Sequence, residues 1–227
     1  QAVADQFRDP TKPDRDLSNS NYGVRFGTLV GGWDLAAFYY RAFATSPTFY
    51  RTAAGIYEPE YDRIWQVGGT LSKDLGNAVL RAEAVYANGG YFASTDAAAP
   101  RGVVQRDTLD WIVSAEMPFE SIDGRVNVQV FQRYYFNGGR DAVALDTGSF
   151  GASLLVSAKV TPEIEPSLQW IQGFGGAGGM IRPRLNWYAA RNLVVGVGAD
   201  IFTGDEDGLF GRYDNRDRGY VDVRYDF

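Results

Sequence analysis

The sequence predicts an all-β fold, an antiparallel transmembrane β-barrel, and three observations support this prediction. Polar and apolar residues alternate in segments that turn residues separate along most of the 227-residue chain, which is the pattern of β-strands. Most segments have about 10–13 residues, whereas soluble strands have about 5–6 and a tilted strand that crosses a bilayer needs ~9–11. Short and long connections also alternate along the chain, as they do in outer-membrane barrels.

About 11 strands are expected, each bounded by turn residues. They are residues 21–30, 34–44, 62–73, 77–88, 107–119, 125–136, 149–160, 164–174, 180–190, 193–203 and 219–227. Residues 1–20 contain Pro10, Pro13 and many charges without alternation, so an irregular segment on the extracellular side is expected there. The predicted division is therefore 1–20 irregular and 21–227 barrel strands.

Residues 125–136 illustrate the two faces of a predicted strand. The face expected to point inward carries Arg125, Asn127 and Gln129. The opposite face, expected to contact lipid, carries Val126, Val128 and Val130. A soluble sandwich or a lipocalin-like barrel would also alternate, and this alternative stays open. Its apolar face, however, would hold large interdigitating residues throughout.

The apolar faces carry mainly Ala, Val and Leu at mid-strand and aromatic residues toward the strand ends. This is typical of a lipid-facing band flanked by aromatic girdles. The candidates for the girdles are Trp65, Tyr86, Trp111, Tyr134, Tyr135, Trp170 and Trp187. The last strand ends in the aromatic sequence YVDVRYDF (residues 220–227), which resembles the terminal signal that the outer-membrane barrel-assembly machinery recognises.

The connections after the first, third, fifth, seventh and ninth strands are tight, and most of the others are long. The long ones are residues 45–61, 89–106, 137–148 and 204–218. In outer-membrane barrels the short turns are periplasmic and the long loops extracellular. The Gly-rich link 175–179 precedes a strand rather than a helix, so it predicts a flexible extracellular hairpin and not a phosphate-binding loop.

The odd number of strands has a consequence for closure. If residues 219–227 end in the periplasm, residues 21–30 run parallel to them, whereas bacterial single-chain barrels have an even number of antiparallel strands. We therefore expect no complete seam between these two segments, and we expect the chain to be the C-terminal part of a larger barrel. A missed or wrongly divided strand is the alternative.

Charged and amide side chains are expected to line the lumen. They are Arg25, Arg81, Glu83, Asp110, Glu116, Arg125, Asn127, Gln129, Arg133, Arg182, Arg184, Asp222 and Arg224. Two interpretations stay open, namely ion-pair ladders that fill a narrow lumen and a charge-lined conduction path. A weaker hypothesis is that Asp205, Glu206 and Asp207 bind a divalent cation such as Ca²⁺, although a solvated loop is the simpler interpretation.

Composition excludes several classes of function. The chain has no Cys and no His, which excludes disulfides, thiolate or His-ligated metal sites and Ser-His-Asp triads. A net charge of −6 argues against a nucleic-acid partner. No cofactor is expected. The expected partners are outer-membrane lipid and lipopolysaccharide, with other envelope protein chains if the barrel belongs to a larger assembly.

Several segments resemble a family of large Gram-negative outer-membrane β-barrels of unknown function, porin-like proteins that often accompany RND-type lipid exporters. The resemblance rests on GGWDLA (residues 31–36), GGTLSKDLG (68–76), LRAEAVY (80–86) and the terminal YVDVRYDF. It implies transport or channel activity toward a hydrophobic or lipid-related substrate, and a full length of roughly twice this chain. The resemblance assigns no functional residues in this chain, because none are established for the family.

Taken together, these features predict a bacterial outer-membrane channel or transporter barrel for a small or hydrophobic solute, and not an enzyme. The alternative is a structural or scaffolding barrel subunit of a larger outer-membrane assembly.

We expect no hydrolase activity on phospholipid, peptide or acylated sugar, because no histidine is available as a general base. The folded chain, assayed with these three substrate classes, should release no more product than buffer does. Turnover that a single carboxylate substitution abolishes would contradict the prediction.

Overall fold

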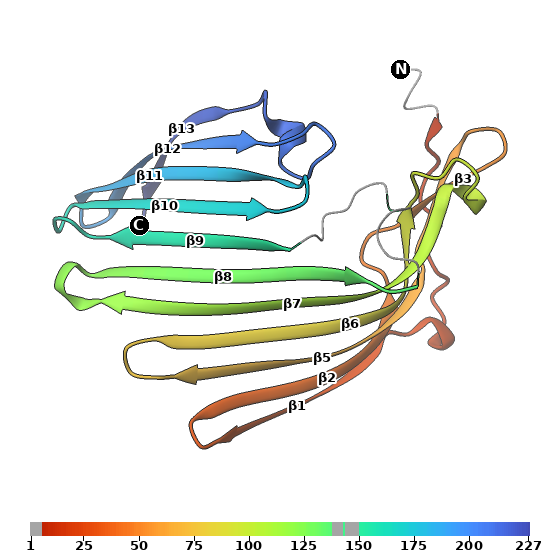
Figure 1. The fold of residues 1–227 in the computed structure, drawn as a ribbon, viewed down its shortest axis with the longest axis horizontal. Coiled ribbons are helices and arrows are strands. Elements are labelled where there is room, and N and C mark those ends of the chain that lie inside the picture. Colours follow the sequence, from red (N-terminus) through yellow and green to blue (C-terminus); the bar gives the residue numbers. More distant parts are fainter. Residues whose placement is uncertain (1–5, 138–142, 144–149) are drawn as a thin grey trace. The chain divides into compact units, whose positions relative to one another are not determined.

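Residues 6–137, 143 and 150–227 are described by the structure, a computed structural model. Eleven strands form one antiparallel sheet in the order β1-β2-β5-β6-β7-β8-β9-β10-β11-β12-β13 (Figure 1). Their bounds are β1 Tyr22–Val30, β2 Trp33–Phe43, β5 Arg63–Asp74, β6 Val79–Ala93, β7 Val103–Phe119, β8 Gly124–Tyr135, β9 Gly151–Ala158, β10 Ile164–Gly173, β11 Gly178–Ala190, β12 Leu193–Thr203 and β13 Arg218–Tyr225. The all-β prediction is confirmed, and each of the 11 predicted strands has its counterpart.

β1 and β13 stand at the two ends of the strand order, and no pairing joins them within the described residues. In the part of the chain that the structure describes, no closed barrel is found. The transmembrane barrel and the continuation of the sheet by further strands therefore stay predictions.

Helical segments among the described residues are single 3₁₀ turns. They are η2 Leu17–Asn19, η3 Pro100–Gly102, η4 Glu120–Ile122 and η5 Gly211–Tyr213. Asp16 caps η2 by accepting a 2.6 Å hydrogen bond at Oδ1 from the Ser18 backbone N–H. Hydrogen bonding from the Ser18 side chain, and then from this N–H, lowers the pKa of the Asp16 carboxyl. In the part of the chain that the structure describes, no helix combines the length and the apolar character needed to cross a membrane.

Tight turns join β1 to β2, β5 to β6, and β7 to β8, as the sequence predicts. Gly31 and Gly32 adopt φ of 56° and 77° between β1 and β2, a left-handed conformation that glycine adopts without a steric penalty. Between β5 and β6, the Gly76 N–H donates to Asp74 Oδ1 at 2.7 Å. The predicted long connection 137–148 lies almost wholly outside the described residues.

A short hairpin, β3 Thr48–Arg51 and β4 Tyr57–Glu60, occupies the predicted loop 45–61. The N-terminal segment adds to it through parallel bridges from Phe7 to Tyr57 and from Thr11 to Glu60. The Phe7 ring stacks on Tyr57 with centroids 5.2 Å apart. Aromatic packing thus holds this part of the segment beside β4, and the division into 1–20 irregular and 21–227 barrel strands stays a prediction.

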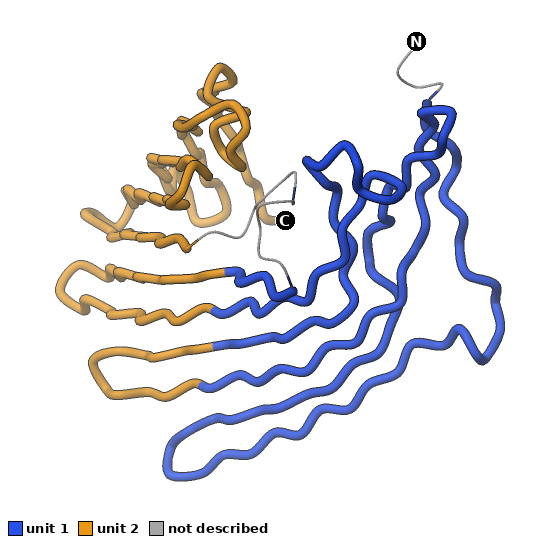
Figure 2. The backbone as a smooth tube through the Cα atoms, turned by 45° about the vertical axis from the view of Figure 1, so that its right-hand side comes forward, with its two compact units in different colours: residues 1–71, 83–111, 133–146 blue, residues 72–82, 112–132, 147–227 orange. Residues whose placement is uncertain are grey.

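The chain forms two compact units, which are described separately (Figure 2). Unit 1 comprises residues 1–71, 83–111 and 133–146, and unit 2 comprises residues 72–82, 112–132 and 147–227. Unit 1 therefore contains the β3–β4 hairpin, and unit 2 contains β9 to β13.

In unit 2, rows of directly opposed apolar residues cross one face of the sheet. One row contains Val128, Leu154, Trp170, Ile181 and Ile201. A second contains Pro166, Leu185, Val197 and Val221, and a third contains Ile164, Trp187, Val195 and Val223. Large members of these rows are exposed, among them Val197 at 50% and Val221 at 68%. Val126, Val128 and Val130 are not buried either, so no closed core contains them.

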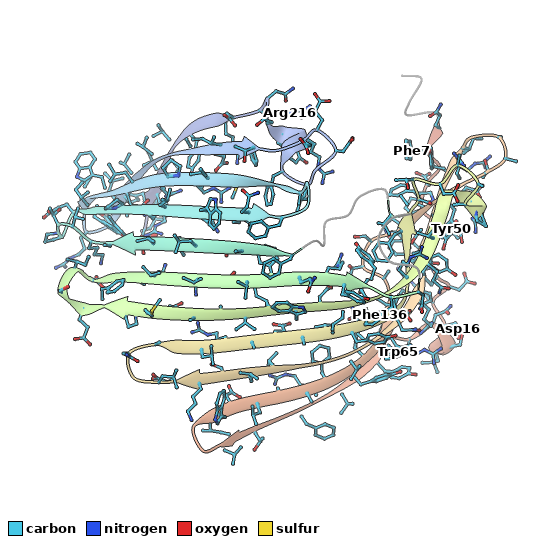
Figure 3. All side chains as sticks on the ribbon, in the orientation of Figure 1. Phe7, Asp16, Tyr50, Trp65, Phe136 and Arg216 are labelled. Carbon is cyan, nitrogen blue, oxygen red and sulfur yellow. The ribbon has the colours of Figure 1, made fainter. Side chains whose placement is uncertain are left out.

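In unit 1, an aromatic cluster runs across neighbouring strands. Its rings are Tyr39, Trp65, Tyr86, Phe136 and Tyr134, and each lies 4.9–6.3 Å from the next (Figure 3 labels Trp65 and Phe136). Three of these five rings are girdle candidates from the sequence.

Tyr135, another girdle candidate, does not belong to the aromatic cluster. It is only 5% exposed and packs against Phe92 with ring centroids 5.4 Å apart. Successive residues of a strand point to opposite faces, so Tyr134 and Tyr135 cannot both lie on the exposed side.

Asp107 holds the aromatic cluster at the start of β7. Its carboxylate accepts hydrogen bonds from the Tyr86 hydroxyl at 2.9 Å, the Asn88 amide at 2.8 Å, the Gly89 backbone N–H at 3.0 Å and the Asn137 amide at 3.0 Å. These bonds tie β6, β7 and the end of β8 together at the level of the rings.

Several large rings lie over glycines on the opposing strand. Phe131 faces Gly151 in the β8–β9 pair, and a Cβ at Gly151 would lie 2.5 Å from Cε2 of Phe131 and 2.9 Å from the Gln172 carbonyl oxygen. Tyr40 covers Gly23, and Tyr220 covers Gly198, in the same way. The absence of a side chain at these glycines therefore gives room to the rings.

Replacing Gly151 with alanine should destabilise the protein by about 1–3 kcal/mol, because the Phe131 ring or the backbone has to shift. Gly27→Ala is the matched control, since a Cβ there meets no atom closer than 3.7 Å, and its effect should stay within ~0.5 kcal/mol. Denaturant unfolding of both variants measures the difference. Equal midpoints would contradict the prediction.

Candidate functional site

The polar face of the sheet in unit 2 carries ion pairs that link neighbouring strands. Arg184 Nη2 of β11 donates to Asp222 Oδ2 of β13 at 2.9 Å, and Arg184 Nε donates to Asn186 Oδ1 at 2.8 Å. Gly196 of β12 lies between them, and a Cβ there would lie 2.5 Å from Arg184 Nη2 and 2.7 Å from Asp222 Oδ1. The missing side chain lets a guanidinium reach across one strand to a carboxylate on the next.

Asp200 is the centre of a second set of ion pairs on β12. Its side chain is 0% exposed, and it accepts from Arg182 Nε at 2.5 Å and from Arg218 Nε at 2.7 Å. Both carboxylate oxygens are therefore paired with guanidinium groups from the strands on either side. Asp200 and Arg182 both belong to the face expected to point inward from the sequence.

Other predicted lumen residues also pair within unit 2. Arg81 lies 3.5 Å from Glu116, and Arg224 lies 3.5 Å from Asp226. The Ser153 hydroxyl donates to Gln129 Oε1 at 3.2 Å. In the part of the chain that is described, no ion pair or side-chain hydrogen bond is found for Arg25, Glu83, Arg125 or Asn127.

In unit 1, the polar face carries the bidentate pair of Arg133 with Asp110. Arg133 Nε donates to Asp110 Oδ1 at 2.6 Å, and Nη2 donates to Oδ2 at 2.7 Å. Both side chains are more than one third exposed, 34% for Arg133 and 39% for Asp110. A paired but accessible charge of this kind can still form hydrogen bonds with groups outside the pair.

A cavity of about 590 Å³ lies beside this pair, wholly within unit 1. Its walls come from the end of β2, the start of β5, the end of β6, β7, β8 and the β3 strand with the segment 44–47 before it. The aromatic rings that line it are Tyr40, Phe43, Phe49, Tyr91 and Phe92. Its polar lining includes Asp62, Gln66, Thr108, Asp110 and Arg133.

Asp62, immediately before β5, is the carboxylate of this lining that has no cationic partner among the described residues. Its Oδ1 accepts from the Tyr50 hydroxyl at 2.7 Å. Its Oδ2 is buried and has no hydrogen-bond partner in the described structure. Burial, together with the bond to Asp62, raises the pKa of the Tyr50 phenol, so this hydroxyl stays protonated and keeps donating.

Tyr50, the hydrogen-bond partner of Asp62, is itself fixed from several sides (Figure 3 labels Tyr50). Tyr50 is 5% exposed, and the Arg101 guanidinium lies 3.9 Å from the centroid of its ring. Arg101 also pairs with Glu60 of β4. The Ala44 N–H donates to the Asp62 carbonyl at 2.8 Å, which holds the segment after β2 against the start of β5.

The loops of unit 2 pack closely against each other. The Phe210 N–H donates to the Ala177 carbonyl at 2.9 Å, and a Cβ at Gly208 would lie 2.3 Å from the Gly176 carbonyl oxygen. The Gly-rich link predicted as a hairpin does join β10 to β11, and it also supports the connection before β13.

The acidic cluster Asp205, Glu206 and Asp207 does not form a metal site in this structure. Among the described residues, no three acidic groups converge closely enough to hold a metal ion. All three residues are exposed, which agrees with a solvated loop.

The cavity was not predicted from the sequence. Asp62 and Tyr50 lie in or beside the connection 45–61, where no alternation indicates which side chains meet. The only signal is local, the aromatic and acidic composition of residues 57–62. By contrast, Asp110 and Arg133 were both predicted to line the lumen, and the structure pairs them.

Comparison of the sequence with known protein families and with curated proteins finds no match. The family resemblance described above therefore stays a prediction.

Replacing Asp200 with asparagine should destabilise the protein by about 1–3 kcal/mol, because two guanidinium groups lose their charged acceptor. Asp226→Asn is the matched control. Asp226 is 65% exposed and its partner Arg224 is 66% exposed, and such surface pairs contribute ~0–1 kcal/mol. Denaturant unfolding at constant ionic strength compares the two, and equal losses would contradict a special role for Asp200.

Proposed function

We propose that this protein is an outer-membrane barrel that acts as a channel or transporter for a small or hydrophobic, lipid-related solute. The single observation that carries the proposal is the sheet of unit 2. One of its faces carries exposed apolar rows, and the opposite face carries ion-paired charges. Outer-membrane barrels have this arrangement, with an apolar band facing lipid and a polar interior.

The exposed rows argue against a soluble barrel or sandwich. A soluble protein buries its apolar sheet face in a core and rarely exposes a contiguous apolar patch larger than a few hundred Å². Here the large aliphatic residues of β11, β12 and β13 are exposed side by side, including Leu185, Val197 and Val221. Lipid is the environment that would cover such rows without a second layer of protein.

Passage through the lumen is supported by the accessibility of its paired charges. Arg184 and Asp222 retain side-chain exposures of 32% and 45% while paired. Paired wall charges provide hydrogen-bonding groups for a polar solute without the cost of an uncompensated charge. The lipid-related solute class depends on the family resemblance, and the aromatic lining of the cavity in unit 1 is compatible with it.

A structural or scaffolding barrel is the second candidate. The observation that favours it is the pairing itself, because Arg182, Arg184 and Arg133 all bind carboxylates of the same chain. Wall charges that are matched in this way can serve stability alone.

Two measurements separate these candidates. Flotation of the refolded chain with lipid vesicles tests membrane insertion, and a protein that stays soluble would overturn both. Planar-bilayer recording then tests conduction, and we expect discrete conductance steps for a channel. An inserted protein without conductance or solute flux would favour the structural barrel.

Arginine at Val128 should prevent or weaken membrane insertion, whereas arginine at the adjacent Asn127 should be tolerated. A charge on the lipid face near the bilayer midplane costs about 2–4 kcal/mol, while the lumen side is polar. Unfolding in lipid vesicles compares the two variants, which differ in position by one residue. Equal destabilisation would contradict the assignment of Val128 to the lipid face.

A further inference from the structure

We infer that the cavity of unit 1 is a binding site for an organic ammonium ion, with Asp62 as the residue that pairs with the ammonium group. The inference goes beyond conduction, because it concerns a ligand held in unit 1 and depends only on the folding of that unit. It rests on the charge, the hydrogen-bonding capacity and the aromatic lining of the cavity.

The charge of the lining is unbalanced. Among the described residues, the lining contains two carboxylates, Asp62 and Asp110, and one guanidinium, that of Arg133. The guanidinium binds both oxygens of Asp110, so these two charges compensate each other. The negative charge of Asp62 remains, and it favours a ligand with a single positive charge.

The hydrogen bonding of Asp62 specifies the type of cation. Oδ1 is used by the Tyr50 hydroxyl, whereas Oδ2 is buried without a partner among the described residues, so the Asp62 carboxylate has to turn toward the cavity before a ligand can reach this oxygen. A buried acceptor without a donor costs about 1–3 kcal/mol, and more when it is charged. A primary or secondary ammonium supplies both the N–H donor and the positive charge, whereas a quaternary ammonium supplies no N–H.

The remainder of the cavity suits the organic part of such a ligand. Five aromatic rings and several small apolar side chains form its wall, and aromatic faces attract ammonium groups as well as apolar surface. A volume of about 590 Å³ falls in the range of small-molecule sites, about 300–1,000 Å³. A metal ion is a poor alternative, since no three acidic groups converge in the described part of the chain.

The backbone and the Tyr50 side chain around Asp62 are held in place without a ligand. The Tyr50 hydroxyl bond, the Arg101 guanidinium over the Tyr50 ring and the Ala44 bond to the Asp62 backbone fix these groups. A site that is fixed before binding loses less conformational entropy when it binds.

The test measures binding of 2-phenylethylamine to the full chain in detergent micelles by isothermal titration calorimetry at neutral pH. We expect saturable binding at one site per chain. The neutral analogue 2-phenylethanol should bind about tenfold or more weakly, because it lacks the charge that Asp62 pairs with. No saturable amine binding, or equal affinity for amine and alcohol, would overturn the inference.

Asp62→Asn is the variant that tests the residue. It keeps an acceptor for Tyr50, so we expect amine binding to fall by about tenfold or more while the weak alcohol binding is unchanged. Glu58→Gln is the matched control, since it removes a carboxylate of the nearby strand β4 that is not among the described residues lining the cavity, and its affinity should stay within about twofold of wild type. Unchanged amine binding in Asp62→Asn, or loss of both ligands together, would overturn the assignment of Asp62.

The outcome is independent of the proposed function. Amine binding in micelles requires no conduction, so a barrel without conductance can still show it. Conversely, a conducting barrel that fails to bind the amine would leave the channel proposal intact and remove only this site.

Discussion

The two-residue period of the antiparallel strand is the constraint on which the rest of this structure depends. Each strand presents alternate side chains to two different environments, and the pairing register decides whether the faces of neighbouring strands agree. In unit 2 the register places Leu185 opposite Val197, and Val197 opposite Val221. A slip of one residue would bring arginine and aspartate into the apolar rows.

The ion pairs of the polar face favour the same register as the apolar rows. Arg184 reaches Asp222 only because β11, β12 and β13 are aligned so that Gly196 lies between them. Asp200 likewise joins Arg182 and Arg218 across β12. The apolar contacts on one face and the ion pairs on the other therefore favour the same register between the strands. When independent interactions favour the same arrangement, the sequence selects a single fold.

Most of the fold could be predicted because long strands repeat this period many times. β7 and β11 have 17 and 13 residues, so their alternation is unmistakable in the sequence. The β3–β4 hairpin could not be predicted, since four residues per strand give too few repeats to distinguish a strand from a loop. The bridges of Phe7 and Thr11 to this hairpin were missed because they depend on contacts far apart in the sequence.

The sequence predicted which types of residue form the candidate site, but not which of these residues pair with each other. Alternation indicated that Arg182 and Arg184 share a face, yet the choice of Asp200 and Asp222 as their acceptors depends on the register between strands. The cavity of unit 1 was beyond prediction for a related reason. It is built where strands end and the chain turns back, so no periodicity links Tyr50 to Asp62.

The paired face and the cavity differ in what they can discriminate. Where one arginine is matched by one carboxylate, as Arg184 is by Asp222, the pair presents no net charge and can provide hydrogen bonds to solutes of either sign. Asp62 differs because its charge is not matched by a cation of the described chain and because one of its oxygens is buried. An unmatched carboxylate in a low-dielectric wall interacts more strongly with a cation than an exposed one does. Selection by charge is therefore expected at the cavity, where the connections between strands meet, rather than at these one-to-one pairs.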